Sequence, residues 1–393
     1  MGLILNDLKN ACELEHVCDY VNNRTTSSMN YISTENMLPN KGGISESTII
    51  PPGTTTEYKI GDILISNIRP YFQKIWCADR CGGCSADVLC IRAKENTDSK
   101  YLYYLLSQQA FFDYVMSGAK GCKMPRGDKK QIMQWPVNIP AIDVQKKVVA
   151  ILSSLDNKIR LTRRINDNLE EQAKALFKSW FVDFEPFKGG KFVDSELGLI
   201  PKGWSTGTIY SYIDVIYGAP YKSALFNDKK QGLPLIRIRD LKTYTPQYYT
   251  KEVLPNTEYV ECGDIIAGMD AEFIPHIWRG EKGVLNQRLC KFVPKYDYVS
   301  KYYIYSLVYP KLAFVQSYKV GTTVSHLGKA DIDRFKVIVP PEDIIMQYSK
   351  IVNSYFAEIV KVSNENQILS SLRDTLLPKL MSGELSVEEV SLD

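Results

Sequence analysis

The chain contains few of the residues and motifs on which catalysis depends. It has three histidines, His16, His276 and His326, and their spacing indicates neither a metal site nor a catalytic triad. It lacks a Gly-x-x-x-x-Gly-Lys-Ser/Thr phosphate loop, a dinucleotide-binding fingerprint, His-Glu-x-x-His and Gly-x-Ser-x-Gly. It also lacks Asn/Asp-Pro-Pro-Tyr/Phe, which holds the target amine in amino-methyltransferases, and its carboxylates form no evident pair. The sequence therefore predicts a protein that is not an enzyme by itself.

Long apolar runs and a strong excess of charge are also missing. No stretch of 18 apolar residues exists, so we expect no membrane span. The first six residues lack the apolar core of a signal peptide, and Asn6 stands where a myristoylation site has Ser or Thr. These absences predict a cytoplasmic protein. The net charge is only +3, so any surface that binds nucleic acid must be local.

The nine cysteines favour reduced thiols, because their number is odd and no export signal accompanies them. Four of them, Cys77, Cys81, Cys84 and Cys90, are close enough in sequence to hold zinc. Cys90, however, stands in the alternating apolar run 88–91, which is typical of a buried strand, and the matching run 288–292 has Cys290 at the equivalent place and no other cysteine. We therefore favour free core cysteines over a structural zinc site, and predict no metal.

Two long amphipathic stretches organise the chain. The first runs from about Asp143 to Phe181 and the second from about Glu342 to Leu377, where Pro378 is expected to end the helix. Apolar or small residues recur every three or four positions along one side of each: Val148, Leu152, Leu155, Ile159, Thr162, Ile165, Leu169, Ala173, Leu176 and Trp180, then Tyr348, Val352, Tyr355, Ile359, Val362, Asn366, Leu369, Leu372 and Leu376. Each stripe needs a partner, so we predict that the helices pack together. Asn166 and Asn366 either set the register of this pair or lie at its wet edge.

The remaining sequence contains an internal repeat, with one copy in residues 1–142 and the other in residues 184–341. Gly61-Asp62 matches Gly263-Asp264, the strand-like run 88–91 matches 288–292, and Ser99 and Ser300 each begin a helical stretch, the first reaching about Met116. Short strands with at least one helix indicate an α+β fold. We predict two copies of one domain related by a pseudo-two-fold axis, at 1–142 and 184–341, with long helices at 143–183 and 342–385 forming an antiparallel coiled coil, and a tail at 386–393.

Two corresponding loops contain the side chains that are best suited to binding a ligand. Residues 117–130 hold five cations and one anion among glycines, a set that can neutralise phosphates or contact guanine. The matching loop, 321–329, offers hydroxyl, imidazole and ammonium donors instead. A solvated surface loop is the alternative for each. The predicted DNA-binding residues, with Arg288 as a further candidate, are Asn67, Arg69, Lys120, Lys123, Arg126, Lys129, Arg237, Arg239, Arg279, Thr322, Thr323, Ser325, His326 and Lys329.

The sequence resembles the DNA specificity subunits of type I restriction-modification systems over essentially its whole length. The stretches that carry the resemblance, in the expected order, are 31–40, 61–72, 123–128, 152–159, 177–181, 200–204 and 376–385. The interior of the second copy, about 205–335, is the least similar. The resemblance implies two target recognition domains, each docking one half of a bipartite site in double-stranded DNA, with the coiled coil as a ruler between them.

The resemblance also implies the partners. Adenine methylation with S-adenosylmethionine belongs to two modification subunits, and ATP- and Mg-dependent translocation and cleavage belong to restriction subunits. This chain is expected to bind no cofactor, and its helices to dock the modification subunits. Two alternatives are a coiled-coil adaptor that never contacts DNA and a self-sufficient methyltransferase. The basic loop disfavours the first, and the missing methyltransferase motif disfavours the second.

Overall fold

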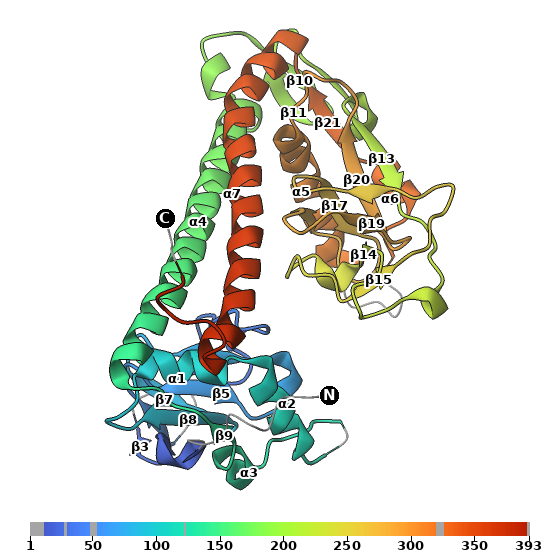
Figure 1. Cartoon of the computed structure of the whole chain (residues 1–393). Helices are drawn as coiled ribbons and strands as arrows, with labels where there is room; N and C mark the ends of the chain where they lie inside the picture. Colours follow the sequence, from blue (N-terminus) through green and yellow to red (C-terminus); the bar gives the residue numbers. More distant parts are fainter. Residues whose placement is uncertain (1–11, 27–29, 48–52, 122, 320–325, 391–393) are drawn as a thin grey trace. The chain divides into compact units, whose positions relative to one another are not determined.

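The computed structural model describes residues 12–26, 30–47, 53–121, 123–319 and 326–390 (Figure 1). The chain divides into two compact units: unit 1 is Met1–Asn157 with Ser371–Asp393, and unit 2 is Lys158–Ser370. Two long helices, α4 (Ile142–Phe181) and α7 (Glu342–Ser382), contribute one segment to each unit. Among the described helices, none combines the length and apolarity that crossing a membrane requires.

Unit 1 is built on a four-stranded antiparallel sheet with the order β2-β8-β5-β6. Its strands are β2 (Cys18–Tyr20), β5 (Ile63–Ser66), β6 (Ile75–Cys77) and β8 (Val88–Ala93). A second sheet has the order β3-β4-β7, and β1 pairs with β9. These strands are β1 (Cys12–Glu13), β3 (Arg24–Thr25), β4 (Thr55–Tyr58), β7 (Gly82–Cys84) and β9 (Pro136–Val137), and the helices are α1 (Ser99–Leu106), α2 (Gln109–Ser117) and α3 (Lys129–Met133).

Unit 2 repeats this plan with the order β13-β20-β17-β18 in its main sheet. Those strands are β13 (Ile213–Tyr217), β17 (Ile265–Gly268), β18 (Pro275–Ile277) and β20 (Leu289–Pro294). The second sheet is β15 (Tyr248–Thr250), β14 (Leu233–Ile236), β19 (Gly283–Leu285) and β16 (Tyr259–Val260). Around them lie β10 (Phe192–Ser195), β11 (Gly198–Pro201), β12 (Ser205–Thr208), β21 (Lys336–Val339), α5 (Lys301–Lys319) and α6 (Lys329–Asp333). The shared strand order confirms the predicted α+β fold with a repeated domain.

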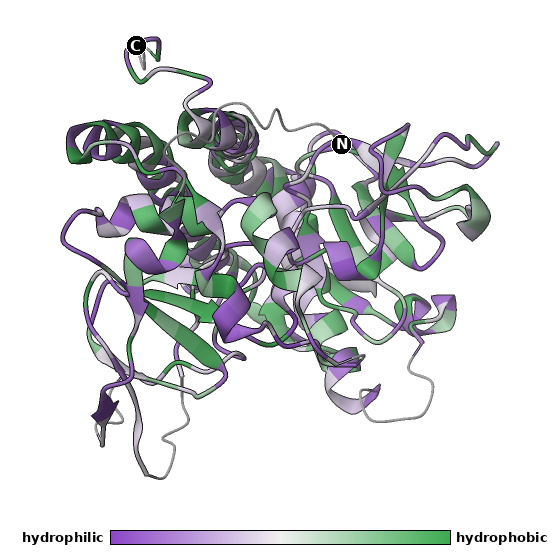
Figure 2. Cartoon of the chain, turned by 60° about the horizontal axis from the view of Figure 1, so that its bottom comes forward, coloured by the Kyte–Doolittle hydropathy of each residue, from purple (hydrophilic) through white to green (hydrophobic). Residues whose placement is uncertain are grey.

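The centre of each main sheet is apolar because its middle strand is covered on both faces. All four residues of β5 and of β17 are buried, and hydrophobic residues dominate the sheets (Figure 2). In unit 1 the sheet and helices α1 and α2 share one core with Leu152 of α4 and with Leu377 and Leu380 of α7. The segments of the long helices are therefore part of the domain core.

The Gly-Asp turn before the middle strand is the same in both units. Gly61 and Gly263 adopt φ values of 89° and 93°, in the left-handed region that glycine reaches without steric cost. The carboxylates of Asp62 and Asp264 each accept a hydrogen bond from the backbone N–H three residues earlier, at 2.7 and 3.0 Å. A short sequence motif thus dictates a turn and aligns the two copies.

Each of these aspartates is neutralised by cations from the same unit. Asp62 accepts two hydrogen bonds of 2.7 Å from Arg92. Asp264 accepts one of 2.6 Å from Lys301, and the Lys291 ammonium lies 3.6 Å away. A buried carboxylate without such partners is strongly destabilising, so each pair is a structural element of its sheet.

The thiols of the eight described cysteines are free. The described part of the chain holds no cluster of three or more His, Cys, Asp or Glu that could bind a metal ion. Strand pairing corrects the sequence match in this region: Cys90 lies opposite Leu64, and Lys291 lies opposite the equivalent Ile266. The counterpart of Cys90 is therefore Lys291 rather than Cys290, because the match by sequence was displaced by one residue.

Within unit 2, α4 and α7 pack antiparallel (Figure 1). Asn166 on α4 is 1% exposed and donates from its amide to the Ile359 carbonyl at 3.3 Å and to the Ser363 hydroxyl at 3.0 Å. Thr162, one turn earlier, donates to Asn366 at 2.6 Å. Ile165, which the predicted stripe included, is 40% exposed. The buried seam runs through Asn166 instead, so this asparagine joins the helices and does not lie at a wet edge.

Two predicted helix boundaries are wrong. Helix α7 continues through Pro378 to Ser382, although proline removes one backbone hydrogen bond, because Leu380 and Met381 are buried in the core of unit 1. The predicted helix from Ser99 to about Met116 is interrupted after Leu106. There the hydroxyl of Ser107 donates to the carbonyl four residues earlier, at 2.6 Å, and α2 begins at Gln109.

Candidate nucleic-acid interface

In unit 1, three backbone segments meet beside the end of β5. The N–H of Asn67 donates to the carbonyl of Asp87 at 2.9 Å, and the N–H of Gly127 donates to the carbonyl of Asn67 at 3.3 Å. Ile68 and Arg126 form an antiparallel bridge. We call this meeting point the loop junction of unit 1: residues 67–69, 85–88 and 125–127. It fixes the C-terminal part of the basic loop to the sheet.

Unit 2 contains the same junction, formed by residues 269–271, 286–289 and 326–327. The N–H of Met269 donates to the carbonyl of Arg288 at 2.9 Å, and the N–H of Leu327 donates to the carbonyl of Met269 at 2.7 Å. Asp270 and His326 form the antiparallel bridge. The shared bonds establish residue equivalence: Arg288 takes the place of Asp87, His326 that of Arg126, and Asp270 that of Ile68.

The turn before the last sheet strand is also the same in both junctions. The Ser85 hydroxyl accepts a hydrogen bond from the N–H of Asp87 at 3.1 Å. In unit 2 the Asn286 side-chain oxygen accepts one from the N–H of Arg288 at 3.3 Å. Such local side-chain bonds fix the turn backbone whatever residue stands two positions later. The side chains of Asp87 and Arg288 are therefore free to differ.

In unit 1 the basic loop is held by two ion pairs. Arg126, 57% exposed, lies 3.1 Å from the Asp87 carboxylate. The Lys120 ammonium lies 2.9 Å from the carboxylate of Asp128, which also caps α3 by accepting hydrogen bonds from two backbone N–H groups. The hydrogen bond from Lys120 and these amides lower the pKa of Asp128. The single anion of the loop is thus engaged locally, while Lys123 and Lys129 remain exposed.

In unit 2 a carboxylate stands at the centre of the junction. Asp270 accepts hydrogen bonds from the Arg288 guanidinium and from Nδ1 of His326, the latter at 2.7 Å. Burial by itself raises the pKa of Asp270, but the hydrogen bonds from His326 and Arg288 outweigh it and lower the pKa from that of an ordinary aspartate. Arg288 is 65% exposed. The junction thus presents an oriented guanidinium at the surface.

Asn67 and Arg69 lie at the junction, but not as freely exposed side chains. The amide oxygen of Asn67 and Nε of Arg69 are buried and have no hydrogen-bond partner among the described residues. Arg69 has a φ of 50°, and its counterpart Ala271 has one of 59°. Left-handed backbone is rare for residues other than glycine, and its recurrence at one equivalent position marks a constrained turn.

Three arginines predicted from unit 2 have different surroundings. Arg237 packs over the ring of Tyr248, 4.2 Å from its centroid, and burial lowers the pKa of its guanidinium. Arg239 is exposed on the 3₁₀ turn Ile238–Asp240. Arg279 forms an ion pair with Glu170 of α4, and burial lowers its pKa as well. The structure therefore connects Arg279 to the long helix rather than to the loop junction.

The remaining candidates belong to the loop before α6. Thr322, Thr323 and Ser325 lie outside the described residues. His326 lies in the junction, and Lys329 is exposed at the start of α6. The Lys319 ammonium donates to the His326 carbonyl at 2.9 Å, which ties this loop to the end of α5.

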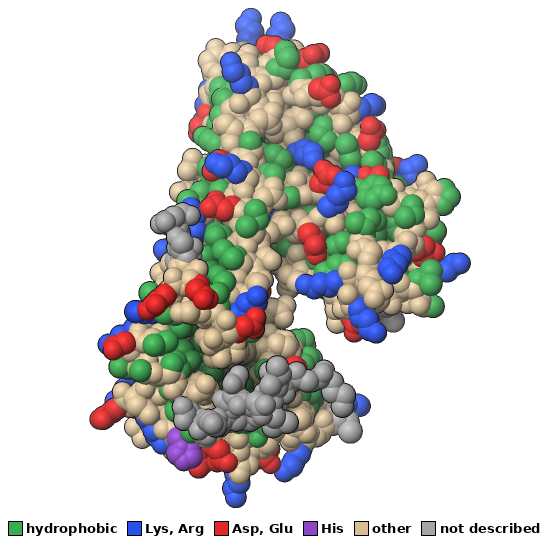
Figure 3. Space-filling model, in the orientation of Figure 1, with side chains coloured by type: hydrophobic (Ala, Val, Ile, Leu, Met, Phe, Trp, Pro, Cys, Tyr) green, Lys and Arg blue, Asp and Glu red, His purple; other side chains and the backbone are tan. Residues whose placement is uncertain are grey.

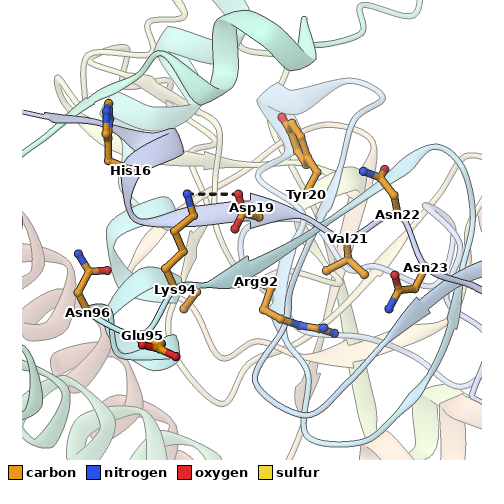
Figure 4. A pocket seen from close by; sticks show the side chains of 11 residues that line it. His16, Asp19, Tyr20, Val21, Asn22, Asn23, Arg92, Lys94, Glu95 and Asn96 are labelled. Carbon is orange, nitrogen blue, oxygen red and sulfur yellow. Dashed lines mark ion pairs between the residues drawn. The ribbon is translucent and has the colours of Figure 1, made fainter.

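A pocket of about 760 Å³ lies elsewhere in unit 1, between β2 and the end of β8 (Figure 4). Asp19 and Lys94 are 3.3 Å apart along its wall, and Arg92 reaches toward Asp62. It includes no residue of the loop junction, so we assign it no ligand. On the face shown in Figure 3, basic side chains are interspersed with acidic ones, which agrees with the small net charge.

The comparison with protein families is decisive. The model of the type I restriction modification DNA specificity domain matches twice, at residues 10–171 and 201–370, which together make up most of the chain. The chain belongs to this family. Each match contains one main sheet and one loop junction, so the two junctions occupy equivalent places in two DNA specificity domains.

Two relatives by sequence carry names that agree with this assignment. The MjaIX type I restriction enzyme specificity subunit of Methanocaldococcus jannaschii is 28% identical over 325 residues, which cover 76% of this chain and 71% of the relative. The HindI specificity subunit of Haemophilus influenzae is 24% identical, with 90% and 94% covered. The crystal structure of a type I restriction-modification S subunit from M. genitalium aligns over 97% of this chain and 98% of its own, with a TM-score of 0.48 and 14% identity.

Sequence reasoning missed the carboxylates of the specificity domains. Asp87 and Asp270 were not candidates, because an acidic residue does not by itself attract a polyanion. Both hold a cation at the loop junction, and they occupy different segments of it. Only the strand register and the backbone hydrogen bonds reveal which positions of the two junctions are equivalent, since the residue types at these positions differ between the two copies.

Proposed function

We propose that this chain is the DNA-reading subunit of a type I restriction-modification complex, in which each specificity domain contacts one half of a bipartite site in double-stranded DNA. The observation that carries the proposal is the pair of loop junctions. Their backbone bonds are the same, whereas the paired side chains are Arg126 and Asp87 in one and Arg288, Asp270 and His326 in the other. Two readers of different base sequences require a constant frame with varied side chains.

The predicted contacts follow from the first junction. Arg126, positioned by Asp87, is suited to a guanine edge or a phosphate. Lys120, Lys123 and Lys129 are exposed on the same loop and at the start of α3, and are suited to phosphates. In the second domain Lys329, at the start of α6, stands in the place of Lys129. These lysines supply the local positive charge that the chain as a whole lacks.

In this proposal the readers are residues 1–142 and 184–341, the helical segments 143–183 and 342–385 set the spacer, and 386–393 form a tail. Helices α4 and α7 are 40 and 41 residues long, and an α-helix rises about 1.5 Å per residue, so each is long enough to act as a ruler. The same helices dock two modification subunits.

The chain performs no chemical step in this proposal. S-adenosylmethionine binds the modification subunits, which methylate adenine, while ATP and Mg bind the restriction subunits. The complex acts in the cytoplasm, where its DNA substrate lies. What the chain contributes is the choice of site.

The test is to assemble the chain with its modification subunits and S-adenosylmethionine, and to map the methylated adenines on genomic DNA. The proposal predicts a motif of two specified parts separated by a gap of fixed length. The purified chain alone is expected to bind DNA and to methylate nothing. Methylation without partners would establish a self-sufficient enzyme, and failure of the complex to bind any DNA would favour a coiled-coil adaptor; either result contradicts the proposal.

A further inference from the structure

The arginine of the loop junction stands on different segments in the two domains. In unit 1, Arg126 lies on the loop before α3 and pairs with Asp87 on the turn before β8. In unit 2 the position of Arg126 is taken by His326 and that of Asp87 by Arg288, while the carboxylate is supplied by Asp270 at the end of β17. An ion pair is present in both junctions, but both of its members have moved: Arg288 stands at the position of Asp87, and Asp270 at the position of Ile68.

Both arginines remain accessible although they are paired. Arg126 is 57% exposed and Arg288 65%, whereas the carboxylate of Asp270 is only 24% exposed. An ion pair this exposed adds little to stability, so holding the fold together does not account for it. A guanidinium has five N–H donors, and a carboxylate on one side orients it while leaving donors for a second acceptor.

His326 is a poor substitute for the arginine it replaces. Its Nδ1 is 2.7 Å from Asp270, so one ring nitrogen is already engaged. The single remaining nitrogen cannot form the two parallel hydrogen bonds by which arginine recognises guanine. The residue of the second junction that retains this capacity is Arg288.

The backbone of the turn does not explain the choice of arginine either. Arg288 receives its turn geometry from Asn286, as Asp87 receives its own from Ser85. This bond uses only the backbone N–H of residue 288, so it does not require an arginine side chain.

We propose that Arg288 reads a base pair for the second specificity domain, in the role that Arg126 has in the first; this inference rests on the proposed function. Asp270 is the residue that positions Arg288. The ligand is the major-groove edge of a base pair, most suitably guanine. The reading arginine is thus carried by the turn before β20 instead of the loop before α6.

The experiment uses the complete methyltransferase complex and a library of duplexes randomised at each position of the recognised site. Arg288→Ala is expected to reduce discrimination roughly 5- to 150-fold at one base pair of one half-site. Arg288→Lys keeps the charge but not the fork, and is expected to lose most of the same discrimination. Lys282→Ala is the matched control, because it removes an exposed cation paired with Glu261 near the opposite end of β17, and it is expected to change nothing.

Asp270→Asn separates positioning from folding. It is expected to weaken discrimination at the same base pair, and the double variant with Arg288→Ala is expected to be no worse than Arg288→Ala alone. Equal discrimination in Arg288→Ala and wild type, or a uniform loss of affinity with discrimination intact, would overturn the inference and leave the proposed function standing. If the wild-type complex itself shows no bipartite specificity, the proposed function fails instead.

Discussion

The side-chain amide of Asn166 donates a hydrogen bond to the hydroxyl of Ser363, 3.0 Å away, across the seam between α4 and α7. One turn earlier, Thr162 donates to Asn366. The two bonds are compatible with one antiparallel register, because sliding either helix by a turn would leave these polar groups against apolar neighbours. The two bonds therefore fix the register of α4 against α7 in unit 2.

Replacing Asn166 with alanine is expected to lower the free energy of unfolding by about 1–2 kcal/mol, since the Ser363 hydroxyl loses its donor and a buried polar contact is removed. Denaturant unfolding followed by circular dichroism measures the change. Asn168→Ala is the control, because Asn168 lies exposed on the same helix. An equal loss of unfolding free energy in the two variants would show that the Asn166–Ser363 hydrogen bond does not stabilise the helix pair.

Gly127 and Leu327 occupy equivalent positions. Adding a side chain at Gly127 and shortening the side chain of Leu327 are both expected to lower the free energy of unfolding. A Cβ on Gly127 would lie 2.8 Å from Val115 Cγ1 and 2.9 Å from Asn67 Oδ1, so Gly127→Ala is expected to cost about 1–3 kcal/mol through overpacking. Leu327 is fully buried, and Leu327→Ala is expected to cost about 2–5 kcal/mol through the cavity it leaves.

Thermal and urea unfolding of the two variants provide the measurement. Gly189→Ala is a suitable control, because no atom lies within 4 Å of a Cβ built there. A neutral Gly127→Ala would mean that the junction of unit 1 has room to adjust.

Arg126→Ala and Lys123→Ala are expected to weaken DNA binding without affecting assembly with modification subunits. If Lys123 contacts a phosphate, its removal reduces the slope of log Kobs against log salt concentration by about 0.9. Loss of a base contact by Arg126 costs about 1–3 kcal/mol at one base pair. Fluorescence anisotropy over a salt series measures the first effect, and competition with substituted duplexes measures the second.

Arg80→Ala is the control for that series, because Arg80 is an exposed, paired arginine on the turn between β6 and β7. Affinity that is unchanged at moderate salt in both loop variants would remove the basic loop from the interface. Loss of co-elution with the modification subunits would indicate that the loop serves assembly instead.

Asp270 is expected to make a small contribution to the stability of unit 2 that depends on pH in the acid range. Burial raises the pKa of Asp270, but the hydrogen bonds from His326 and Arg288 outweigh it, so its folded-state pKa lies below that of an ordinary aspartate. A lowered carboxylate pKa gives stability that is present above the unfolded-state pKa and is lost as the pH falls through the folded-state pKa. The difference in unfolding free energy between wild type and Asp270→Asn should therefore be constant at neutral pH and shrink below about pH 4.

The same scan on His326→Ala separates the contribution of the imidazole from that of Arg288. A difference that persists undiminished to pH 2, or that disappears near pH 6, would contradict the assignment of Asp270 as the titrating group.

The main architecture could be predicted from sequence because short local patterns of residue types determine its turns and long helices. The Gly-Asp turns at Gly61 and Gly263 need a left-handed backbone and an aspartate that caps it, and both requirements are visible as residue types. The long helices were visible from their period. Their ends were less so: Pro378 is tolerated because the residues after it are buried, and burial is a property of the tertiary structure.

The interface could be predicted only in part. The basic loop with Arg126 and Lys123 was apparent from charge and glycine content. The partners Asp87 and Asp270 were not, because their role depends on three segments that meet through backbone bonds. The match of Cys90 with Cys290 shows the same limit, since a shift of one residue in a strand is invisible in a run of apolar residues.

We propose that the two specificity domains read the two halves of the site independently. The most direct measurement replaces residues 1–142 with those of another family member, assembles the complex with modification subunits, and maps the methylated adenines by sequencing. One half of the motif is expected to change, while the other half and the gap stay the same. A change in both halves, or in neither, would contradict the account.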